Sequence, residues 1–195
     1  MTARKAGAAL ALAILAVPGQ ASDVPVEPLA TVQDLMRYAV DANADPIWDA
    51  VGAVTTRDGV AERQPRTDAE WDAVRRHAVL LLEATNLLVI PGRKVSAVPF
   101  RSDGPGVLGS ADIQRTIDRN RGRFNAFALE LRAIVSSELQ AIDKHDANAL
   151  QSLGESMDAA CEACHVANWY PHEVVPELPA APPAPKGRFK SHPDT

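Results

Sequence analysis

Apolar residues recur every three or four positions along most of this chain, which is the spacing of one face of an α-helix. The first such stretch predicts a helix over about residues 31–55, ending near Gly59. Thr31 and Asp34 resemble a capping box at its start, and Pro46 is expected to kink it because proline removes a backbone hydrogen bond. The apolar stripe comprises Val32, Leu35, Met36, Ala39, Val40, Asn43, Ile47 and Val51.

A second helix is predicted between Thr67, which forms a capping box with Glu70, and Pro91-Gly92, which stop it. Its wide apolar stripe contains Trp71, Val74, Ala78, Leu81, Leu82, Thr85, Leu88 and Val89. Residues 91–110 then hold three Pro and four Gly without a sustained period. A loop of this length either covers part of the molecule or is a solvated excursion.

Ser110 is expected to cap a third helix of about thirty residues, slightly weakened by Gly122, and Asp146 is expected to cap a fourth. The third stripe comprises Ile113, Ile117, Phe124, Phe127, Leu131, Ile134, Val135, Leu139 and Ile142. The inner face of the fourth helix carries Leu150, Leu153, Met157, Ala160, Cys161 and Cys164. Four long amphipathic helices without a convincing strand predict an all-α fold, an antiparallel four-helix bundle. The short joint between the third and fourth helices makes those two neighbours.

The two ends of the chain are expected to lie outside this helical domain, which we place at residues 31–172. Residues 1–21 read as a signal peptide, with a positive start, a short apolar run and a small-x-small cleavage site before Ser22. An uncleaved membrane anchor is the rival reading, although the apolar run is well short of the roughly 20 residues that span a bilayer. Residues 22–30 are expected to be an extended lead-in, and residues 173–195 a Pro-rich flexible tail.

The charge of the chain restricts its partners. Residues 1–21 carry two basic and no acidic residues, so their removal changes the net charge from −5 to −7. An acidic exported protein is a poor candidate for binding nucleic acid. After removal of the signal, no other segment is long and apolar enough to span a membrane. The charge fits docking to a basic partner protein.

The motif Cys161-Glu162-Ala163-Cys164-His165 carries the most specific chemistry in the sequence. In C-x-x-C-H, each thiol adds to one haem vinyl group and the adjacent imidazole reaches the iron. On a helix, residues three apart lie on one face, so both cysteines reach one edge of a porphyrin. A structural zinc site needs four ligands, commonly with further paired cysteines or histidines, and this chain has only two cysteines and no paired histidines. A thioredoxin-like dithiol is expected in a βαβ setting, which the helical pattern of this chain does not provide. The motif therefore predicts one covalent haem c, with His165 as an axial iron ligand.

The position of the motif resembles that in the class II cytochromes c, the four-helix cytochrome c′ family, which carry C-x-x-C-H on the last helix. The resemblance covers roughly residues 31–170 and includes the aromatic pair Trp169-Tyr170. Many cytochromes c′ have an aromatic residue three positions after the axial histidine, where this chain has Asn168. The family includes low-spin members, in which a Met from the first helix fills the sixth iron position, and high-spin members that leave it open and bind small gases.

The second axial ligand must come from upstream of the motif. Met157 and His172 lie on the same side of the haem as His165 and do not reach across its plane. Met36, on the inward stripe of the first helix, is the predicted second iron ligand, and the low-spin members of the resembling family place their ligand comparably. The alternatives are that Met36 only fills a gap in the core and that His77 supplies the ligand.

These residues predict an electron carrier in the periplasm rather than an enzyme. Iron, held by His165 and Met36, would carry single electrons between redox partner proteins. Two other functions remain open: a high-spin protein that binds NO or CO, and a haem subunit of a periplasmic oxidoreductase complex. A homodimer is compatible with each of them.

Overall fold

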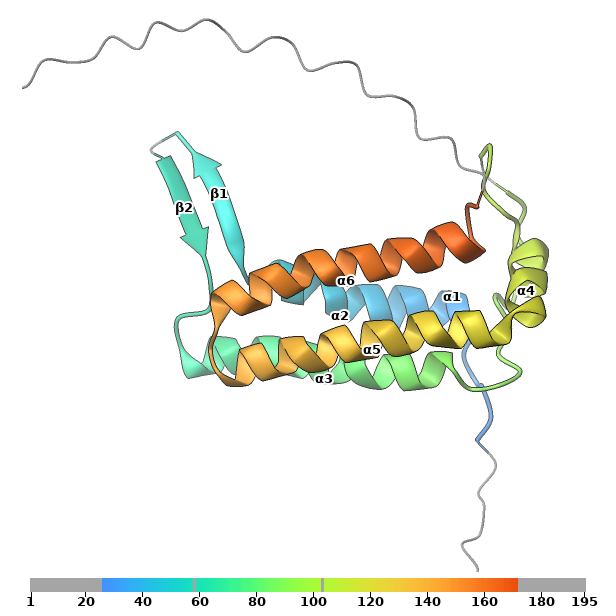
Figure 1. Cartoon of the computed structure of the whole chain (residues 1–195), viewed down its shortest axis with the longest axis horizontal. Coiled ribbons are helices and arrows are strands. Elements are labelled where there is room, and N and C mark those ends of the chain that lie inside the picture. The colour runs from blue at the N-terminus through green and yellow to red at the C-terminus, as the bar shows by residue number, and fades with distance from the viewer. Residues whose placement is uncertain (1–25, 58, 103, 172–195) are drawn as a thin grey trace, which may run out of the picture.

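The computed structural model describes residues 26–171 except Asp58 and Asp103, and its fold is largely α-helical with one small two-stranded sheet (Figure 1). The expected signal peptide, residues 22–25 of the lead-in, His172 and the Pro-rich tail lie outside the described residues. No helix in the described part of the chain is long and apolar enough to cross a membrane. In chain order the elements are α1 (Val32–Leu35), the π-helix η1 (Met36–Val40), α2 (Asp41–Trp48), β1 (Gly52–Thr56), β2 (Gly59–Arg63), α3 (Asp68–Leu88), α4 (Ser110–Arg119), α5 (Arg121–Asp143) and α6 (Ala147–Asn168).

The longest helices run side by side and enclose one apolar core (Figure 1). The stretch from α1 through α2 packs on α3, α3 packs on α5, and α5 packs on α6. The predicted pairing of the last two helices is therefore confirmed. Side chains with 2% exposure or less come from every long helix, so the core is continuous along the molecule. The apolar ones are Ala44, Ile47, Ala78, Leu81, Ala84, Leu88, Ile117, Val135, Ile142, Leu150 and Met157.

Three of the predicted helix starts are confirmed by their caps. The Thr31 hydroxyl accepts the N–H of Asp34 at 3.1 Å, and the Asp34 carboxylate accepts the N–H of Thr31 at 3.0 Å. The same reciprocal pair joins Thr67 and Glu70 at the start of α3. Asp146 Oδ1 accepts the N–H of Ala149 at 2.9 Å at the start of α6. Each cap satisfies N–H groups that a helix cannot pair internally.

The predicted end of the first helix is wrong. The helix ends at Trp48, and the residues expected to continue it form an antiparallel hairpin in which Gly52 pairs with Arg63 and Thr56 with Gly59. Gly52 has a φ of 145° and Gly59 a φ of 128°, conformations that side chains with a Cβ rarely adopt. The expectation that the chain contains no strand is therefore also wrong. The hairpin is almost wholly exposed and projects beyond the helices, at the end where α6 begins (Figure 1).

The predicted third helix is two helices. The chain leaves helical geometry at Asn120, where φ is −138° and ψ is 57°, and the Asn120 side chain accepts the N–H of Arg123 as the cap of α5. The preceding helix, α4, lies at the end of the molecule where α6 terminates (Figure 1). Ser110 is also not the cap that we predicted, because Gly109 occupies that position and Ser110 is the first residue of α4.

Candidate functional site

The two cysteines and the histidine of the motif lie in the last two turns of α6, and all three side chains are partly buried. Both thiols are free. Because α6 is helical through Asn168, the spacing of three places Cys161 and Cys164 on one face, as we expected from the sequence. The helix therefore presents two unpaired sulfur atoms and an imidazole along one edge.

Asn168 closes this end of α6 by bonding to the motif itself. Its amide Nδ2 donates to the carbonyl oxygen of Cys164 at 2.9 Å and lies 3.7 Å from the Cys164 sulfur. The carbonyl of His165 accepts the N–H groups of Trp169 at 2.7 Å and of Tyr170 at 3.2 Å. The His165 ring lies edge-on to the Trp169 ring, with centroids 5.5 Å apart. These contacts fix the backbone on which the imidazole stands.

Two adjoining cavities border the motif, with volumes of about 240 and 190 Å³. Together they reach the range of roughly 300–1,000 Å³ that is common for small-molecule sites. Five residues line both of them: Met36, Asp41, Phe124, Cys164 and His165. Cys161 lines the second cavity only. The fold therefore brings Met36 to the motif at two adjoining cavities.

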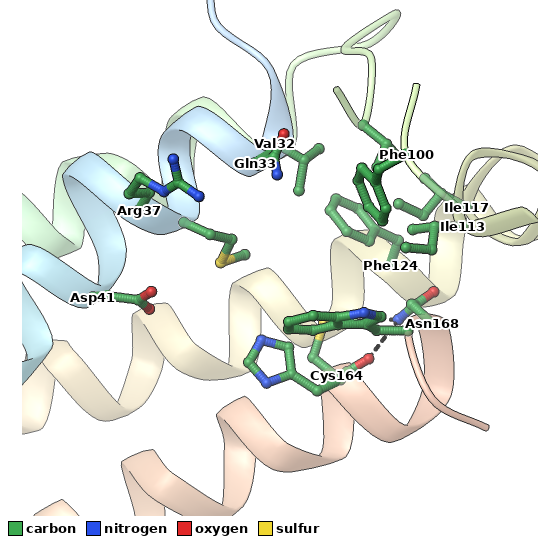
Figure 2. A pocket seen from close by; sticks show the side chains of 14 residues that line it. Val32, Gln33, Arg37, Asp41, Phe100, Ile113, Ile117, Phe124, Cys164 and Asn168 are labelled. Atoms are coloured by element: carbon green, nitrogen blue, oxygen red, sulfur yellow. Dashed lines mark hydrogen bonds between the residues drawn. The ribbon is translucent and has the colours of Figure 1, made fainter. Parts of the chain in front are cut away.

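The first cavity is apolar at one end and charged at the other. Figure 2 shows Phe100, Ile113, Ile117 and Phe124 gathered on one side of the space, with Arg37 and Asp41 across from them. A flat apolar group with charged substituents at one edge matches this distribution. Arg37 is the only arginine or lysine of the described residues that lines either cavity.

Met36 reaches the cavities from an unusual turn of helix. It begins the π-helix η1, in which the N–H of Asp41 donates to the carbonyl of Met36, five residues back instead of four. Such a turn accommodates one extra residue and changes which side of the helix the following side chains face. Met36 remains partly buried against the core while Val40 is 3% exposed. Regular α-helical spacing alone would not describe this segment.

The start of α1, and with it the position of Met36, is held by the long loop. The N–H groups of Val32 and Gln33 donate to the carbonyls of Lys94 and Val95 at 2.9 and 3.0 Å. Those N–H groups belong to the first helical turn and have no partner within the helix. Arg93, at the start of this loop, is 3% exposed and donates to the carbonyl of Ala30.

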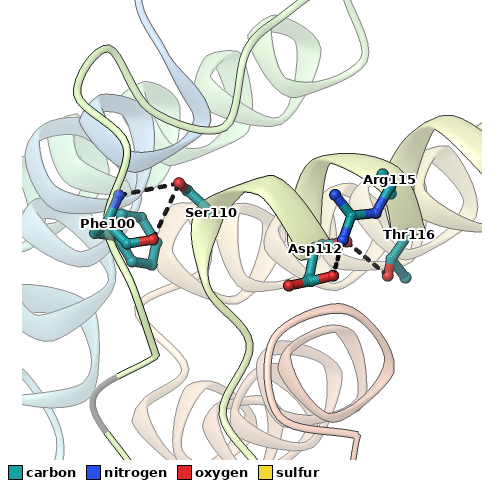
Figure 3. A network of polar contacts seen from close by, with 5 residues as sticks. All are labelled: Phe100, Ser110, Asp112, Arg115 and Thr116. Carbon is teal, nitrogen blue, oxygen red and sulfur yellow. Dashed lines mark hydrogen bonds and ion pairs between the residues drawn. The ribbon is translucent and has the colours of Figure 1, made fainter.

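The rest of the loop forms a wall of the first cavity, to which it contributes Val95 and Phe100. Ser110 anchors it: its hydroxyl accepts the Phe100 N–H at 3.0 Å and donates to the Phe100 carbonyl at 3.3 Å (Figure 3). A Cβ at Gly109 would lie 3.0 Å from that carbonyl oxygen, a close contact that glycine avoids. The N–H of Leu108 donates to the carbonyl of Trp169 at 2.8 Å. Of the two roles considered for the loop, the structure shows the covering one.

The electrostatic surroundings keep both thiols protonated. Burial raises the pKa of Cys161 to about 11, with further contributions from Cys164 and nearby carboxylates. Burial likewise raises the pKa of Cys164 to about 11, and the hydrogen bond from Asn168 opposes the shift only in part. A redox-active dithiol needs a lowered pKa, because the thiolate is the nucleophile. The shifts therefore argue against a thioredoxin-like role for the pair.

Asp41 is the carboxylate that both cavities share. Partial burial raises its pKa and the charge of Asp45 adds to the effect, while the charge of His165 lowers it. Asp41 and His165 thus lie within electrostatic range of each other across the site. Sequence reasoning did not single out Asp41, which begins α2 and carries no pattern that distinguishes it from the other acidic residues.

Several residues considered from the sequence lie elsewhere. His77 lines neither cavity and faces Asn43, with 3.0 Å between His77 Nδ1 and Asn43 Oδ1. Met157 is fully buried away from both cavities. Trp71 of the second apolar stripe lines neither cavity and stacks on His145, with ring centroids 5.0 Å apart, whereas Trp48 lines the second cavity.

Among the residues that the structure describes, no three His, Cys, Asp or Glu side chains are grouped so as to hold a metal ion. The cavities are lined by one imidazole, one thioether and two thiols, groups that fit a haem held by its edge, together with the carboxylates of Asp41, Asp158 and Glu162. Comparison of the chain with family models, with curated proteins and with solved structures finds no match.

Proposed function

We propose that this protein is an exported, periplasmic c-type cytochrome that carries single electrons between redox partner proteins. Cys161 and Cys164 would hold one haem c by thioether bonds, and His165 and Met36 would be its axial iron ligands. The helices would form a four-helix bundle of the class II type around the haem. The chain itself would catalyse no reaction.

One observation carries this proposal: Met36 and His165, from elements at opposite ends of the described chain, line the same two cavities. Cys164 borders both cavities and Cys161 borders one. Sequence spacing brings the cysteines and His165 together, but only the fold brings Met36 to them. Met36 packs against the core but also borders this space, as an iron ligand would have to.

The bound haem would supply the redox-active iron, and the chain holds the groups around it in fixed positions. The bond from Asn168 to Cys164 and the bonds to the His165 carbonyl restrain the imidazole. The loop carbonyls restrain the first turn of α1, on which Met36 depends. Apolar walls exclude water, so little solvent rearranges when an electron arrives or leaves, and His/Met ligation favours a raised reduction potential.

The test is an optical spectrum of the oxidised and reduced protein, with Met36→Ala compared to the unaltered chain. We expect a low-spin c-type spectrum with the weak far-red band of an iron–methionine bond. Met36→Ala should abolish that band and let the reduced protein bind CO rapidly, because the sixth position is then open. A spectrum that Met36→Ala leaves unchanged would contradict the ligation.

Met157→Leu is the matched control, because Met157 is buried but borders neither cavity. It should leave the spectrum intact and cost less than about 1.5 kcal/mol of stability. Rapid CO binding by the unaltered reduced protein would point to the gas-binding function. Loss of covalent haem in a variant with both Cys161→Ser and Cys164→Ser, seen on a denaturing gel, tests the attachment separately.

A further inference from the structure

The core of the protein contains a carboxyl group without a partner. Glu138 lies on α5 at a core position, three residues after Val135 and four before Ile142, and it is 0% exposed. Neither of its side-chain oxygens has a hydrogen-bond partner. Burying an unpaired carboxylate is costly, so burial raises the pKa of Glu138 to about 7. Near neutral pH, a small change in local charge decides whether it holds a proton.

Glu138 lies within electrostatic range of the candidate site. Its charge is among those that raise the pKa of Cys161, one of the residues lining the second cavity. The two residues come from α5 and α6, which pack directly on each other. In the poorly screened interior, charges interact over such separations much more strongly than in water. A change of charge in the cavity therefore acts on the proton affinity of Glu138.

The charged groups of the neighbouring helices do not neutralise Glu138. On α3, Arg75 pairs with Asp143 at 2.8 Å, Arg76 with Asp72 at 2.6 Å, and His77 contacts Asn43. The other ionisable groups that act on Cys161 are Cys164 and Asp158 on α6 and Asp41 on α2, and these are acidic too. Among the described residues, no cation offsets the carboxylate.

We propose that the Glu138 carboxylate binds one proton from water when one electron from a redox donor reduces the iron, and releases it on oxidation. This inference rests on the proposed function. Reduction changes Fe(III) to Fe(II) and removes one positive charge, and the proton taken up restores the charge balance of the core. The carboxylate loses an attraction on reduction, so its proton affinity is higher in the reduced protein.

The coupling has a definite sign. Between the proton affinities of the oxidised and reduced states, near neutral pH, the reduction potential falls as the pH rises. Each tenfold fall in proton concentration lowers it by up to about 59 mV for a one-electron step. Glu138→Gln removes the charge at nearly unchanged volume. Its potential should stay close to the low-pH value of the unaltered protein and lose this pH dependence.

The experiment is a redox titration of the haem-loaded protein across pH 5–9, in the unaltered chain, Glu138→Gln and Glu130→Gln. Glu130 is an exposed carboxylate on the same helix, and water screens its charge. Glu130→Gln should keep the pH dependence of the unaltered protein. The inference is overturned if the reduction potential of the unaltered chain does not depend on pH, or if Glu138→Gln keeps the pH dependence. Neither result contradicts the proposed function as an electron carrier.

Infrared difference spectra between the reduced and oxidised states give a second readout that needs only the unaltered chain. Reduction should produce the C=O band of a buried protonated carboxyl group, and Glu138→Gln should lack it. Absence of the band in the unaltered protein overturns the inference even if Glu138→Gln does not fold. A chain that holds no haem overturns the proposed function as well, and the optical spectrum separates that case from the others.

Discussion

Two glycines in long helices meet different surroundings. A Cβ at Gly122, near the start of α5, would have no atom within 4 Å, whereas one at Gly154, on α6, would lie 3.2 Å from Cδ1 of Trp48. Gly122→Ala should raise the free energy of unfolding by up to about 1 kcal/mol, since alanine restricts the unfolded chain and favours helix. Gly154→Ala should raise the free energy of unfolding less than Gly122→Ala does, or lower it, because the Trp48 ring must shift to make room. That ring is held in place, since its indole N–H donates to the Gly154 carbonyl at 3.1 Å.

Denaturant unfolding of the two glycine variants measures this difference. Equal stabilisation by the two substitutions would show that the Trp48 side chain moves without cost, and hence that α2 and α6 do not pack tightly at this point. A loss in Gly122→Ala would contradict the open surroundings of that position.

Individual residues of the site differ in how far the sequence predicts them. The spacing in C-x-x-C-H indicates the role of the cysteines and His165 before any fold is known. The placement of Met36 was predictable because it falls on an apolar helical stripe, although the π-turn that begins at it was not. The burial of Glu138 was predictable but was not predicted: its spacing from Leu131, Val135 and Ile142 places it on the core face of the helix. The role of Asn168 depends on a hydrogen bond that no pattern announces.

Among the elements, the loop between α3 and α4 forms one wall of the site. Phe100 lines the first cavity, whereas Val98 on the same loop is 76% exposed. If the proposed haem is bound, Phe100→Ala should let water approach it, which favours the more highly charged oxidised state and lowers the reduction potential. Val98→Ala should leave the potential unchanged. Redox titration checks both, and an unchanged potential in Phe100→Ala would mean that the loop does not limit access of water.

The hairpin and the helix ends were predicted poorly because their residues lack, or run past, the apolar periodicity of a buried helix face. The hairpin is exposed on both faces, so it shows no alternation of apolar and polar residues that would indicate a strand. Val51 still fits the helical spacing of the preceding helix, which extends the apparent helix beyond Trp48. The break at Asn120 interrupts a stripe whose apolar spacing continues on both sides. Buried helical faces are therefore predictable here, while helix ends and exposed excursions are not.

For the whole molecule, stability should depend on pH through Glu138. Its pKa rises from 4.5 to about 7 on folding, so between these values the folded protein binds more protons than the unfolded chain. The free energy of unfolding should therefore fall by roughly 3 kcal/mol as pH rises from about 4.5 to about 7. The contribution of protonated Glu138 to the free energy of unfolding is fully present below this pH range and is lost above it. The capping carboxyls Asp34 and Glu70, whose pKa values are lowered by their hydrogen bonds, titrate below it.

Chemical denaturation at several pH values, on the unaltered protein and on Glu138→Gln, measures this dependence. Glu138→Gln should flatten it and be the more stable of the two at pH 8. A variant that keeps the full slope would locate the titrating group elsewhere in the molecule.

The hairpin lies where α6 begins (Figure 1), whereas the first cavity is lined by Cys164, His165 and Asn168 near the end of α6. A helix of 22 residues extends about 33 Å. A molecule immobilised through a label at the tip of the hairpin would therefore present the cavity end to the solution and keep its helical core clear of the support. Attachment near Trp169 would reverse that orientation. The projecting hairpin thus offers a handle for placing single molecules on an electrode in a chosen direction.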